Sequence, residues 1–350
     1  TLAGSPEGKR GPGMREVGLV SDGAVLVREG RIEWVGLTDD LPDRSVDFID
    51  AGGNLVSPGF VDSHTHLAFV GHRANEFDLR NQGATYQEIA VAGGGILSSV
   101  RSVRGASDAE LHAHTLKHAS WLLQCGTTAF EAKSGYGLTA KDEARLLRSS
   151  RSVAQELGVA CKTTFLGCHS IPPEAIEKPA AYVQLMIEEV LPQLVAEGLV
   201  DYADMFVEER YFPPEAAERL ARMASVPLRL HVDQFASAGG AELAVQLGAK
   251  SADHLEATGA SGVEALARSE TFAGLLTGSV TSLGRSQFPP ARDLLDAGAK
   301  VVLATDFNPG SSPVLSMASV MKLARLHMEM AAEEAGEAAT LNAAASLDWG

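Results

Sequence analysis

Along residues 1–55, short apolar runs alternate with polar positions and are separated by turn residues. Apolar and polar side chains that alternate with a period of two are typical of half-buried β-strands. Turns are expected at Glu29–Gly30 and Gly52–Gly53. We therefore predict that residues 1–55 form a small antiparallel β unit, with strands at Gly23–Val27, Arg31–Val35 and Asp47–Asp50.

After Pro58 the pattern changes, and compact apolar runs of strand length alternate with longer segments whose apolar residues recur at helical spacing. The predicted strands are Leu55–Ser63, Thr127–Ala132, Ala160–Gly167, Tyr202–Glu208, Pro227–Val232, Ser251–Leu255, Phe272–Leu276 and Lys300–Thr305. The predicted helices are Asp108–Gln124, Ala140–Leu157, Ala180–Glu197, Pro214–Ala224, Gly240–Leu247 and Ala291–Ala297. Several of these helices have a glycine just past their last residue, as helix ends prefer.

Eight strands, most of them followed by a helix, predict an α/β fold, a (β/α)8 TIM-like barrel over residues 56–350. An open doubly wound sheet is the alternative, but no GxGxxG motif follows the first strand to support a dinucleotide site. Residues 84–104 contain three consecutive glycines and are expected to form a lid or a binding loop. Residues 331–350 predict an alanine-rich helix.

Composition and charge narrow the class of protein. Of the 350 residues, 45% are hydrophobic and 21% are charged, which is the balance of a folded globular protein. The net charge of −16 disfavours nucleic acid and anionic membranes as partners. No apolar run approaches the ~18 residues of a membrane span, and the N-terminus lacks the apolar core of a signal peptide. Three cysteines make no disulfide framework, so we expect a soluble protein of the cytoplasm.

Polar residues gather where four of the predicted barrel strands end, which is where the active site of such a barrel lies. The first of these strands ends in DSHTH, where His64 and His66 are two residues apart and therefore point to the same side. The other three ends carry His231-Val232-Asp233-Gln234, Asp253-His254 and Thr305-Asp306. A single buried histidine is more often a hydrogen-bonded core residue, but four such ends in one barrel are hard to explain by packing.

Several imidazoles and a carboxylate around one open site suit Zn²⁺, iron or manganese. Such an ion lowers the pKa of a bound water from about 15.7 toward about 7, which makes hydroxide available at neutral pH. The fourth predicted barrel strand, Tyr202–Glu208, has no lysine that could be carbamylated to bridge a second ion. Lys133 after the second predicted barrel strand is a candidate for that lysine, but Ser134-Gly135-Tyr136-Gly137 follows it, which is typical of a substrate loop. The sequence therefore favours one metal ion.

Longer motifs carry a resemblance to a known family. PGFVDSHTH, HVDQ, SADHL and ATDFNPGSSP resemble the amidohydrolase superfamily, and GATYQEIAVAGGGI, EAKSGYGL and LGCHSIPPE resemble its imidazolonepropionase family. The resemblance runs from about Val20 to Ala345. It implies metal-dependent hydrolysis of the cyclic amide of 4-imidazolone-5-propanoate to N-formimino-L-glutamate in histidine degradation. It also implies a small-molecule substrate with a carboxylate, and a homodimer.

The resemblance further implies roles for individual residues. The ligands of one divalent or trivalent transition-metal ion, zinc or iron, would be His64, His66, His231 and Asp306. His254 would lie beside the metal-bound water, and the catalytic residues would be His254, Asp306 and Gln234. The substrate pocket would be lined by Arg73, Tyr86, Tyr136, His169, Gln234, Asn308, Gly310 and Ser311. Arg73 suits a propionate because a guanidinium can hold a carboxylate through two parallel hydrogen bonds; a surface salt bridge is its alternative role.

Two features depart from the family pattern. Many members have Glu where this chain has Gln234, and a glutamine can hydrogen-bond a ring but cannot transfer a proton. Proton transfer is therefore expected to fall to His254 and Asp306. In the superfamily, residues after the barrel complete the β-sandwich that the N-terminus begins, and here nothing follows Gly350. We expect either that the sequence continues or that the sandwich lacks strands and has open sheet edges.

Two other functions stay open. A related amidohydrolase, such as a deaminase of a cyclic amidine, would use the same metal site with a different pocket. Arg73 and the NPGSSP loop argue against a nucleobase as its substrate. A catalytically silent, metal-binding barrel is the other alternative, but a scaffold would have no need for a complete, open-sided ligand set.

Overall fold

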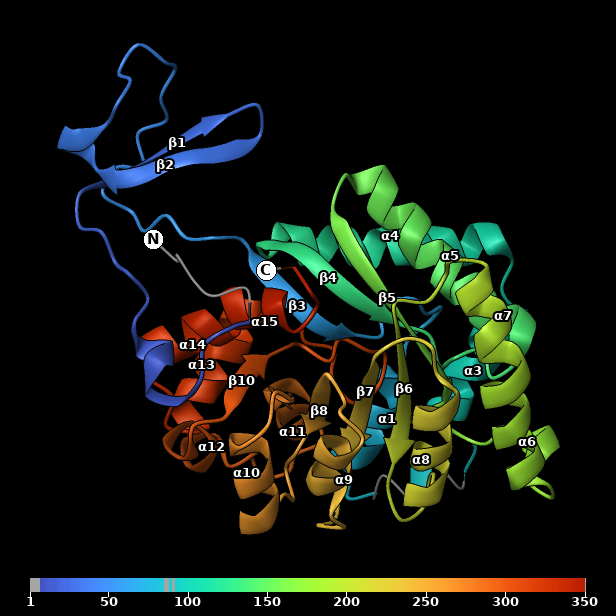
Figure 1. Ribbon diagram of the computed structural model, residues 1–350. Coiled ribbons are helices and arrows are strands. Elements are labelled where there is room, and N and C mark those ends of the chain that lie inside the picture. Colours follow the sequence, from blue (N-terminus) through green and yellow to red (C-terminus); the bar gives the residue numbers. More distant parts are fainter. Residues whose placement is uncertain (1–6, 85–87, 90–91, 350) are drawn as a thin grey trace.

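The chain is built around one sheet of eight strands, which curves into a barrel (Figure 1). The computed structural model describes residues 7–84, 88–89 and 92–349. Each strand from β3 to β10 pairs in parallel with the next one along the sequence, which confirms the predicted (β/α)8 fold. The strands are β3 (Phe60–Thr65), β4 (Thr127–Lys133), β5 (Ala160–Cys168), β6 (Tyr202–Val207), β7 (Leu228–Val232), β8 (Ser251–His254), β9 (Phe272–Leu275) and β10 (Lys300–Leu303).

The barrel closes between β3 and the segment that follows β10. The backbone N–H of His66 donates to the carbonyl of Phe307 at 2.8 Å, and the N–H of Asp306 donates to the carbonyl of His64 at 3.0 Å. The buried carboxylate of Asp62 accepts from both the N–H and the hydroxyl of Thr305, at 3.0 and 2.6 Å. These contacts join the first and the last strand of the sheet.

Helices cover the outside of the barrel (Figure 1). They are α1 (Ala74–Asn81), α3 (Ile96–Gly105), α4 (Asp108–Gln124), α5 (Ala140–Leu157), α6 (Pro179–Leu185), α7 (Leu191–Ala196), α8 (Pro214–Met223), α9 (Gly240–Gln246), α10 (Ala260–Ala267), α11 (Thr277–Ser282), α12 (Ala291–Ala297), α13 (Met317–His327), α14 (Ala332–Ala338) and α15 (Leu341–Ala345). The predicted helices that correspond to α4, α5 and α12 are confirmed at their bounds. No helix of the described residues is both long and apolar enough to cross a membrane.

Local sequence explains where the longer helices begin and end. The hydroxyl of Ser107 accepts from the N–H of Glu110, and the side chain of Glu110 accepts from the N–H of Ser107, so α4 begins with a capping box. Helix α5 ends at Gly158, which takes the left-handed conformation with φ +67°. The predicted helix Ala180–Glu197 is instead α6, a π-helical turn and α7. Pro192 lies in the first turn of α7 and has no N–H to continue an α-helical ladder.

Three other predictions from the sequence are wrong in detail. Asp47–Asp50 forms no strand. The first barrel strand begins at Phe60, and Leu55 before it is 78% exposed, so its apolar side chain belongs to no core of the described chain. The end of the chain is two short helices, α14 and α15, because the backbone leaves the helical region at Thr340 (φ −130°, ψ −88°).

The N-terminal segment has two parts. The 3-10 turn Gly11–Arg15 lies on the barrel, where the N–H of Gly11 donates to the carbonyl of Ala299 at 2.9 Å. Strands β1 (Gly23–Arg28) and β2 (Arg31–Leu37) then form an antiparallel pair that stands away from the barrel (Figure 1). The division of the chain into a β-sandwich part over residues 1–55 and a barrel over residues 56–350 stays a prediction.

The contact between Asp62 and Thr305 yields a stability prediction. Thr305→Val removes the hydroxyl that donates to a buried carboxylate, so we expect the free energy of unfolding to fall by about 1.5–3 kcal/mol. Urea denaturation measures the change. Thr128→Val is the control on the neighbouring strand β4, because the hydroxyl of Thr128 is exposed and donates only to the carbonyl of Phe60 at 3.3 Å; a change within about 0.5 kcal/mol is expected there. Equal losses in both variants would mean that this contact does not stabilise the closure.

Candidate active site

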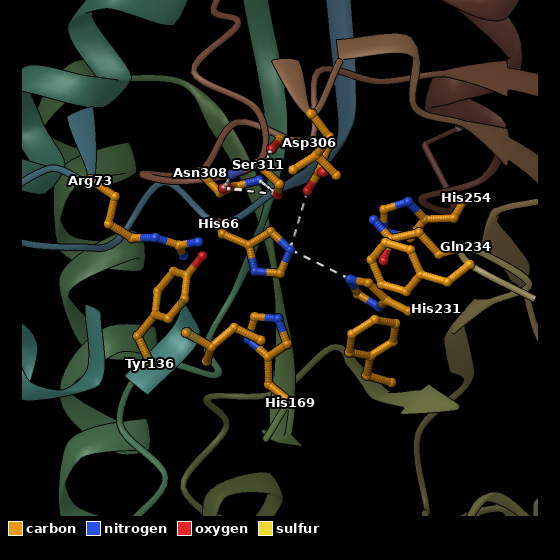
Figure 2. Close-up of a pocket in the computed structure, with 14 residues that line it drawn as sticks. His66, Arg73, Tyr136, His169, His231, Gln234, His254, Asp306, Asn308 and Ser311 are labelled. Carbon is orange, nitrogen blue, oxygen red and sulfur yellow. Dashed lines mark hydrogen bonds and ion pairs between the residues drawn. The ribbon is translucent and has the colours of Figure 1, made fainter. Parts of the chain in front are cut away.

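The carboxyl ends of the barrel strands surround a pocket, at the end of the barrel where the active site of such a fold lies. Most of the residues predicted for the site meet there (Figure 2). The pocket is lined by His66, Arg73, Ile96, Tyr136, His169, Phe206, His231, Gln234, Phe235, His254, Leu283, Asp306, Asn308 and Ser311.

The four predicted metal ligands converge at one side of this pocket. Nε2 of His66 lies 3.4 Å from Oδ1 of Asp306 and 3.4 Å from Nε2 of His231, as the dashed lines in Figure 2 mark. Nε2 of His64 lies 3.7 Å from Oδ1 of Asp306. An ion with bonds of about 2.0–2.2 Å holds its ligand atoms roughly 3–4 Å apart, so these separations suit one ion. A ring nitrogen of His254 also lies within 4.8 Å of ring nitrogens of His64 and His231.

Buried carboxylates accept hydrogen bonds from Nδ1, the ring nitrogen that faces away from the ligand cluster, in two of these histidines. Nδ1 of His64 lies 2.8 Å from Oδ2 of Asp253, and Nδ1 of His231 lies 3.0 Å from Oδ2 of Asp204. Each Nδ1 therefore carries the proton that it donates, which leaves Nε2 unprotonated toward the cluster. Nε2 of His64 is buried and has no hydrogen-bond partner among the described residues. Unprotonated nitrogens beside a carboxylate fit a transition-metal ion.

Burial sets the charge of the cluster. It lowers the pKa of His64, His66 and His231 well below the usual value, and the positive charge of Lys133 adds to this at His64 and His231. All three are therefore neutral at pH 7, the form in which an imidazole binds a metal. Burial raises the pKa of Asp306 to about 7, so a nearby cation is needed to keep this carboxylate fully ionised at neutral pH.

His254 occupies a different electrostatic environment. Burial acts to lower the pKa of His254, but the carboxylates of Glu256, Asp306 and Asp253 outweigh burial, and the pKa lies above its usual value. Nδ1 of His254 lies 3.4 Å from Oε1 of Glu256. The backbone of His254 takes a left-handed conformation, with φ +87°, which costs of order 1–3 kcal/mol in a residue other than glycine. The site thus contains one histidine whose protonated form is stabilised.

Arg73 lies in the pocket wall and is held by its neighbours. Its Nε donates to Oε2 of Glu76 at 3.0 Å, and Oε1 of Glu76 accepts from the N–H of Gly95 at 2.9 Å. A Cβ at Gly310 would lie 2.0 Å from Cζ of Arg73, so only a glycine leaves room for the guanidinium. Arg73 is 5% exposed, and a surface salt bridge is therefore not its role.

The loop after β4 presents Tyr136 to the pocket. This loop folds around the buried carboxylate of Glu143, which accepts from the N–H groups of Gly135, Gly137 and Leu138 at 2.9, 2.8 and 2.8 Å. A Cβ at Gly137 would lie 2.5 Å from the backbone of α5, so the loop packs directly against the start of that helix. Glu143 therefore fixes the position of Tyr136 from behind.

His169 follows β5 and faces the same pocket. Its Nδ1 donates to the carbonyl of Gly135 at 3.1 Å, and its ring stacks on that of His66 with centroids 5.0 Å apart. Burial lowers the pKa of His169 to about 4, so the ring is neutral at pH 7 and its Nε2 can accept a hydrogen bond. In Figure 2 the hydroxyl of Tyr136 points toward the guanidinium of Arg73.

The loop after β10 is shaped by Asn308. Its Oδ1 accepts from the N–H groups of Gly310 and Ser311 at 2.9 and 2.7 Å, and its Nδ2 donates to the carbonyl of Asp306 at 2.7 Å. These bonds occupy most of the amide, so Asn308 holds Gly310 beside Arg73. Contact of Asn308, Gly310 and Ser311 with a substrate stays a prediction.

The sequence motifs contain other candidates for the site. Gln234 lines the pocket, whereas Asp233 turns away and accepts from the N–H groups of Gly240 and Ala241 at the start of α9, at 3.0 and 3.1 Å. Tyr86 lies outside the described residues. Cys168 is buried and burial raises the pKa of its thiol, so it is not a nucleophile at neutral pH.

The sequence did not predict the roles of the buried carboxylates behind the pocket. These residues are Glu76, Glu143, Asp204, Asp253 and Glu256. A signal existed for Asp204, which is a single acidic residue within the otherwise apolar and fully buried strand YADMFV. Such a side chain must have a partner. No local signal could have found the contact of Asp253 with His64, because 189 positions separate the two residues.

Comparison with known proteins extends these observations. The chain matches the model of the Amidohydrolase family over residues 55–350. It is 46% identical to an imidazolonepropionase of Solibacter usitatus (strain Ellin6076) over 357 residues, which cover 100% of this chain and 85% of the relative. It is 47% identical to an imidazolonepropionase of Rubrobacter xylanophilus over 351 residues, 97% of this chain and 84% of the relative.

Solved structures share the fold at much lower identity. A guanine deaminase from C. acetobutylicum superposes with a TM-score of 0.69 at 15% identity and covers 94% of this chain and 82% of its own. An adenosine deaminase from Xanthomonas campestris, solved with bound zinc, has a TM-score of 0.59 at 18% identity and covers 94% and 76%. At these identities the similarity concerns the fold alone.

Proposed function

The chain belongs to the imidazolonepropionases of the amidohydrolase family, and we propose that it hydrolyses the cyclic amide of 4-imidazolone-5-propanoate to N-formimino-L-glutamate in histidine degradation. The observation that carries this function is the identity of 46–47% to named imidazolonepropionases over nearly the whole chain. The pocket agrees with it, because its lining includes both a buried guanidinium and a histidine and aspartate cluster.

One transition-metal ion, zinc or iron, would be held by His64, His66, His231 and Asp306. Three observations support this set: the ligand atoms of His64, His66 and Asp306 lie within 4.8 Å of one another, Nε2 of His231 lies 3.4 Å from Nε2 of His66, and Nε2 of His64 has no hydrogen-bond partner among the described residues. When bound, such an ion acts as a Lewis acid and lowers the pKa of a coordinated water. Asp253 and Asp204 keep the two histidines in the tautomer that this binding requires.

The remaining residues bind and orient the substrate. Arg73 holds the propionate through its guanidinium, whose position is fixed by Glu76 and Gly310. Tyr136 and His169 face the ring from the loops after β4 and β5, and the side chain of Gln234 hydrogen-bonds a ring nitrogen or the carbonyl. Orientation of this kind places the ring carbonyl beside the ligand cluster.

His254 carries the proton in this reaction, with Asp306 assisting. A water oxygen adds to the ring carbonyl carbon, and His254 accepts the proton that the water loses. The bond between that carbon and the ring nitrogen breaks, and the nitrogen takes the proton from His254 as it departs. Glu256 stabilises the protonated imidazole between these two events. Gln234 takes no part in proton transfer, because an amide does not titrate.

A deaminase of a cyclic amidine is the second candidate, since the fold resembles that of a guanine deaminase. The buried guanidinium of Arg73 in the pocket wall favours an anionic substrate instead. One assay tests whether the protein is a non-catalytic metal-binding barrel: substrate absorbance is followed after adding protein, with and without a chelator. Loss of absorbance that the chelator abolishes would exclude a non-catalytic barrel.

We further propose a homodimer that acts in the cytoplasm.

The metal site is tested by His231→Ala. We expect close to one zinc or iron per chain in the unaltered protein by elemental analysis, and the loss of both metal and activity in the variant, because a ligand is removed. His327→Ala serves as the control, since His327 is an exposed histidine of α13 away from the site. Full metal occupancy in His231→Ala would contradict the assignment.

The propionate contact is tested by three variants. Arg73→Ala should lose about 2–4 kcal/mol of transition-state stabilisation, and Arg73→Lys should recover only part of it, because lysine cannot form the paired contact. Gly310→Ala should raise KM, because the new methyl group displaces the guanidinium.

Gly336→Ala is the control for the glycine substitution, since a Cβ at Gly336 meets nothing within 4 Å. Steady-state kinetics give kcat and KM for each variant. If Gly310→Ala behaves like Gly336→Ala, Arg73 does not need its observed position for substrate binding.

Proton transfer is tested by turnover against pH. His254→Ala should lower kcat by ~10²–10⁴, the usual contribution of a general acid or base, whereas Gln234→Glu should change it by less than about tenfold. Because the carboxylate of Glu256 raises the pKa of His254, Glu256→Gln should lower that pKa. The acid limb of kcat/KM should then move to lower pH. Near-normal turnover in His254→Ala would assign the proton to another group.

A further inference from the structure

A cluster of charged side chains lies behind the pocket, and three of its members have no role in the proposed reaction. It consists of Glu131 and Lys133 on β4, Asp204 on β6, Arg229 on β7 and Asp253 on β8, which we call the Lys133 network. All five side chains are at most 1% exposed. Lys133 lies at its centre, with Nζ 2.9 Å from Oε1 of Glu131, 2.9 Å from Oδ2 of Asp204 and 3.9 Å from Oδ2 of Asp253.

Each of the three carboxylates also contacts a strand that carries a proposed metal ligand. Asp253 accepts from Nδ1 of His64 at 2.8 Å, and Asp204 accepts from Nδ1 of His231 at 3.0 Å. Oε2 of Glu131 accepts from the N–H of Thr65 at 3.3 Å, between the two histidines of β3. The ammonium group of Lys133 is thus connected to β3 through Asp253 and Glu131 and to β7 through Asp204, and these are the two strands that supply histidine ligands.

We propose that Lys133 is a positioning residue for the metal centre, whose ammonium group fixes the carboxylates that orient His64 and His231. The proposal rests on the proposed metal site. Lys133 is 1% exposed and is absent from the residues that line the pocket, so it acts through these carboxylates and not on the substrate. From the sequence, Lys133 is expected beside a substrate loop. Its side chain lies instead among the carboxylates of the Lys133 network.

The physical reason is the repulsion among the carboxylates. Charges at such separations in a buried environment interact far more strongly than in water. Without the ammonium group, Asp204 and Glu131 lose their shared partner. Asp253 retains the guanidinium of Arg229, whose Nη2 lies 3.6 Å away, and its hydrogen bond from His64. The carboxylates would then separate, and the Nδ1–H groups of His64 and His231 would lose acceptors in fixed positions. Outer partners of this kind contribute about 10–100-fold to metal affinity.

The experiment measures Zn²⁺ affinity without substrate. The metal-free full chain is titrated with Zn²⁺ against a chromophoric chelator, and thermal unfolding of the same metal-free samples is recorded. Lys133→Met keeps an unbranched side chain, one atom shorter, and removes its charge. Lys300→Met is the matched control, because Lys300 is also buried and paired, with Glu270 at 2.5 Å, but lies at the start of β10, away from the ligands.

We expect Lys133→Met to bind Zn²⁺ about 10–100-fold more weakly than the unaltered chain, and Lys300→Met to bind it within about threefold. With Co²⁺ in place of Zn²⁺, the visible absorption bands of Lys133→Met should also shift, because the ligand nitrogens are reoriented. Affinity in Lys133→Met equal to that of Lys300→Met would overturn the proposal and leave Lys133 a structural ion pair. A failure of the unaltered chain to bind Zn²⁺ would instead refute the metal site itself.

Lys133→Met leaves buried carboxylates without a cation and can fail to fold. The pair of variants Glu131→Gln and Glu131→Gln/Lys133→Met then gives the answer, because removal of one carboxylate relieves the excess negative charge. The double variant should bind Zn²⁺ at least about tenfold more weakly than Glu131→Gln alone. Equal affinities in these two variants would refute the positioning role.

Discussion

The closure of the barrel between β3 and the segment after β10 is the constraint on which the site depends. His64 and His66 come from the first barrel strand, whereas Asp306 follows the last one. The backbone bonds from Asp306 to His64 and from His66 to Phe307 close the sheet and set the spacing of these three side chains at once. The Asp62–Thr305 contact, which spans 243 positions, holds the same junction. Fold closure and ligand geometry therefore rest on the same hydrogen bonds.

Buried carboxylates shape the parts of the site that are not regular structure. Glu143 binds the backbone of the loop that carries Tyr136, Glu76 joins Arg73 to the N–H of Gly95, and Asp233 caps α9. An irregular loop has N–H groups without partners in a helix or sheet, and an ionised carboxylate accepts several of them strongly. The loops around the pocket thus gain fixed positions, which orienting a substrate requires.

The concentration of charge at the centre of the barrel serves function more than stability. Hydrophobic side chains of similar size are often as stabilising as a buried ion-pair network. Here the Lys133 network lies directly behind the histidine cluster, and Glu256 lies behind His254. In a buried environment these groups decide which nitrogens are protonated, and so they determine what the pocket can do chemically.

The sequence by itself determined the order of strands and helices in the barrel and the gathering of histidines and aspartates at four strand ends. Both follow from local rules, because hydrophobic periodicity marks strands and the ends of parallel strands meet at one edge of a sheet. The choice of His64, His66, His231 and Asp306 among them came from the family resemblance and stays a prediction. Only the tertiary structure decided what lies behind these residues, including the pairing of His64 with Asp253 and the burial of Arg73 against Gly310. Such contacts join positions far apart in the chain, and a pattern within one segment contains no information about a partner that packing brings to it from another.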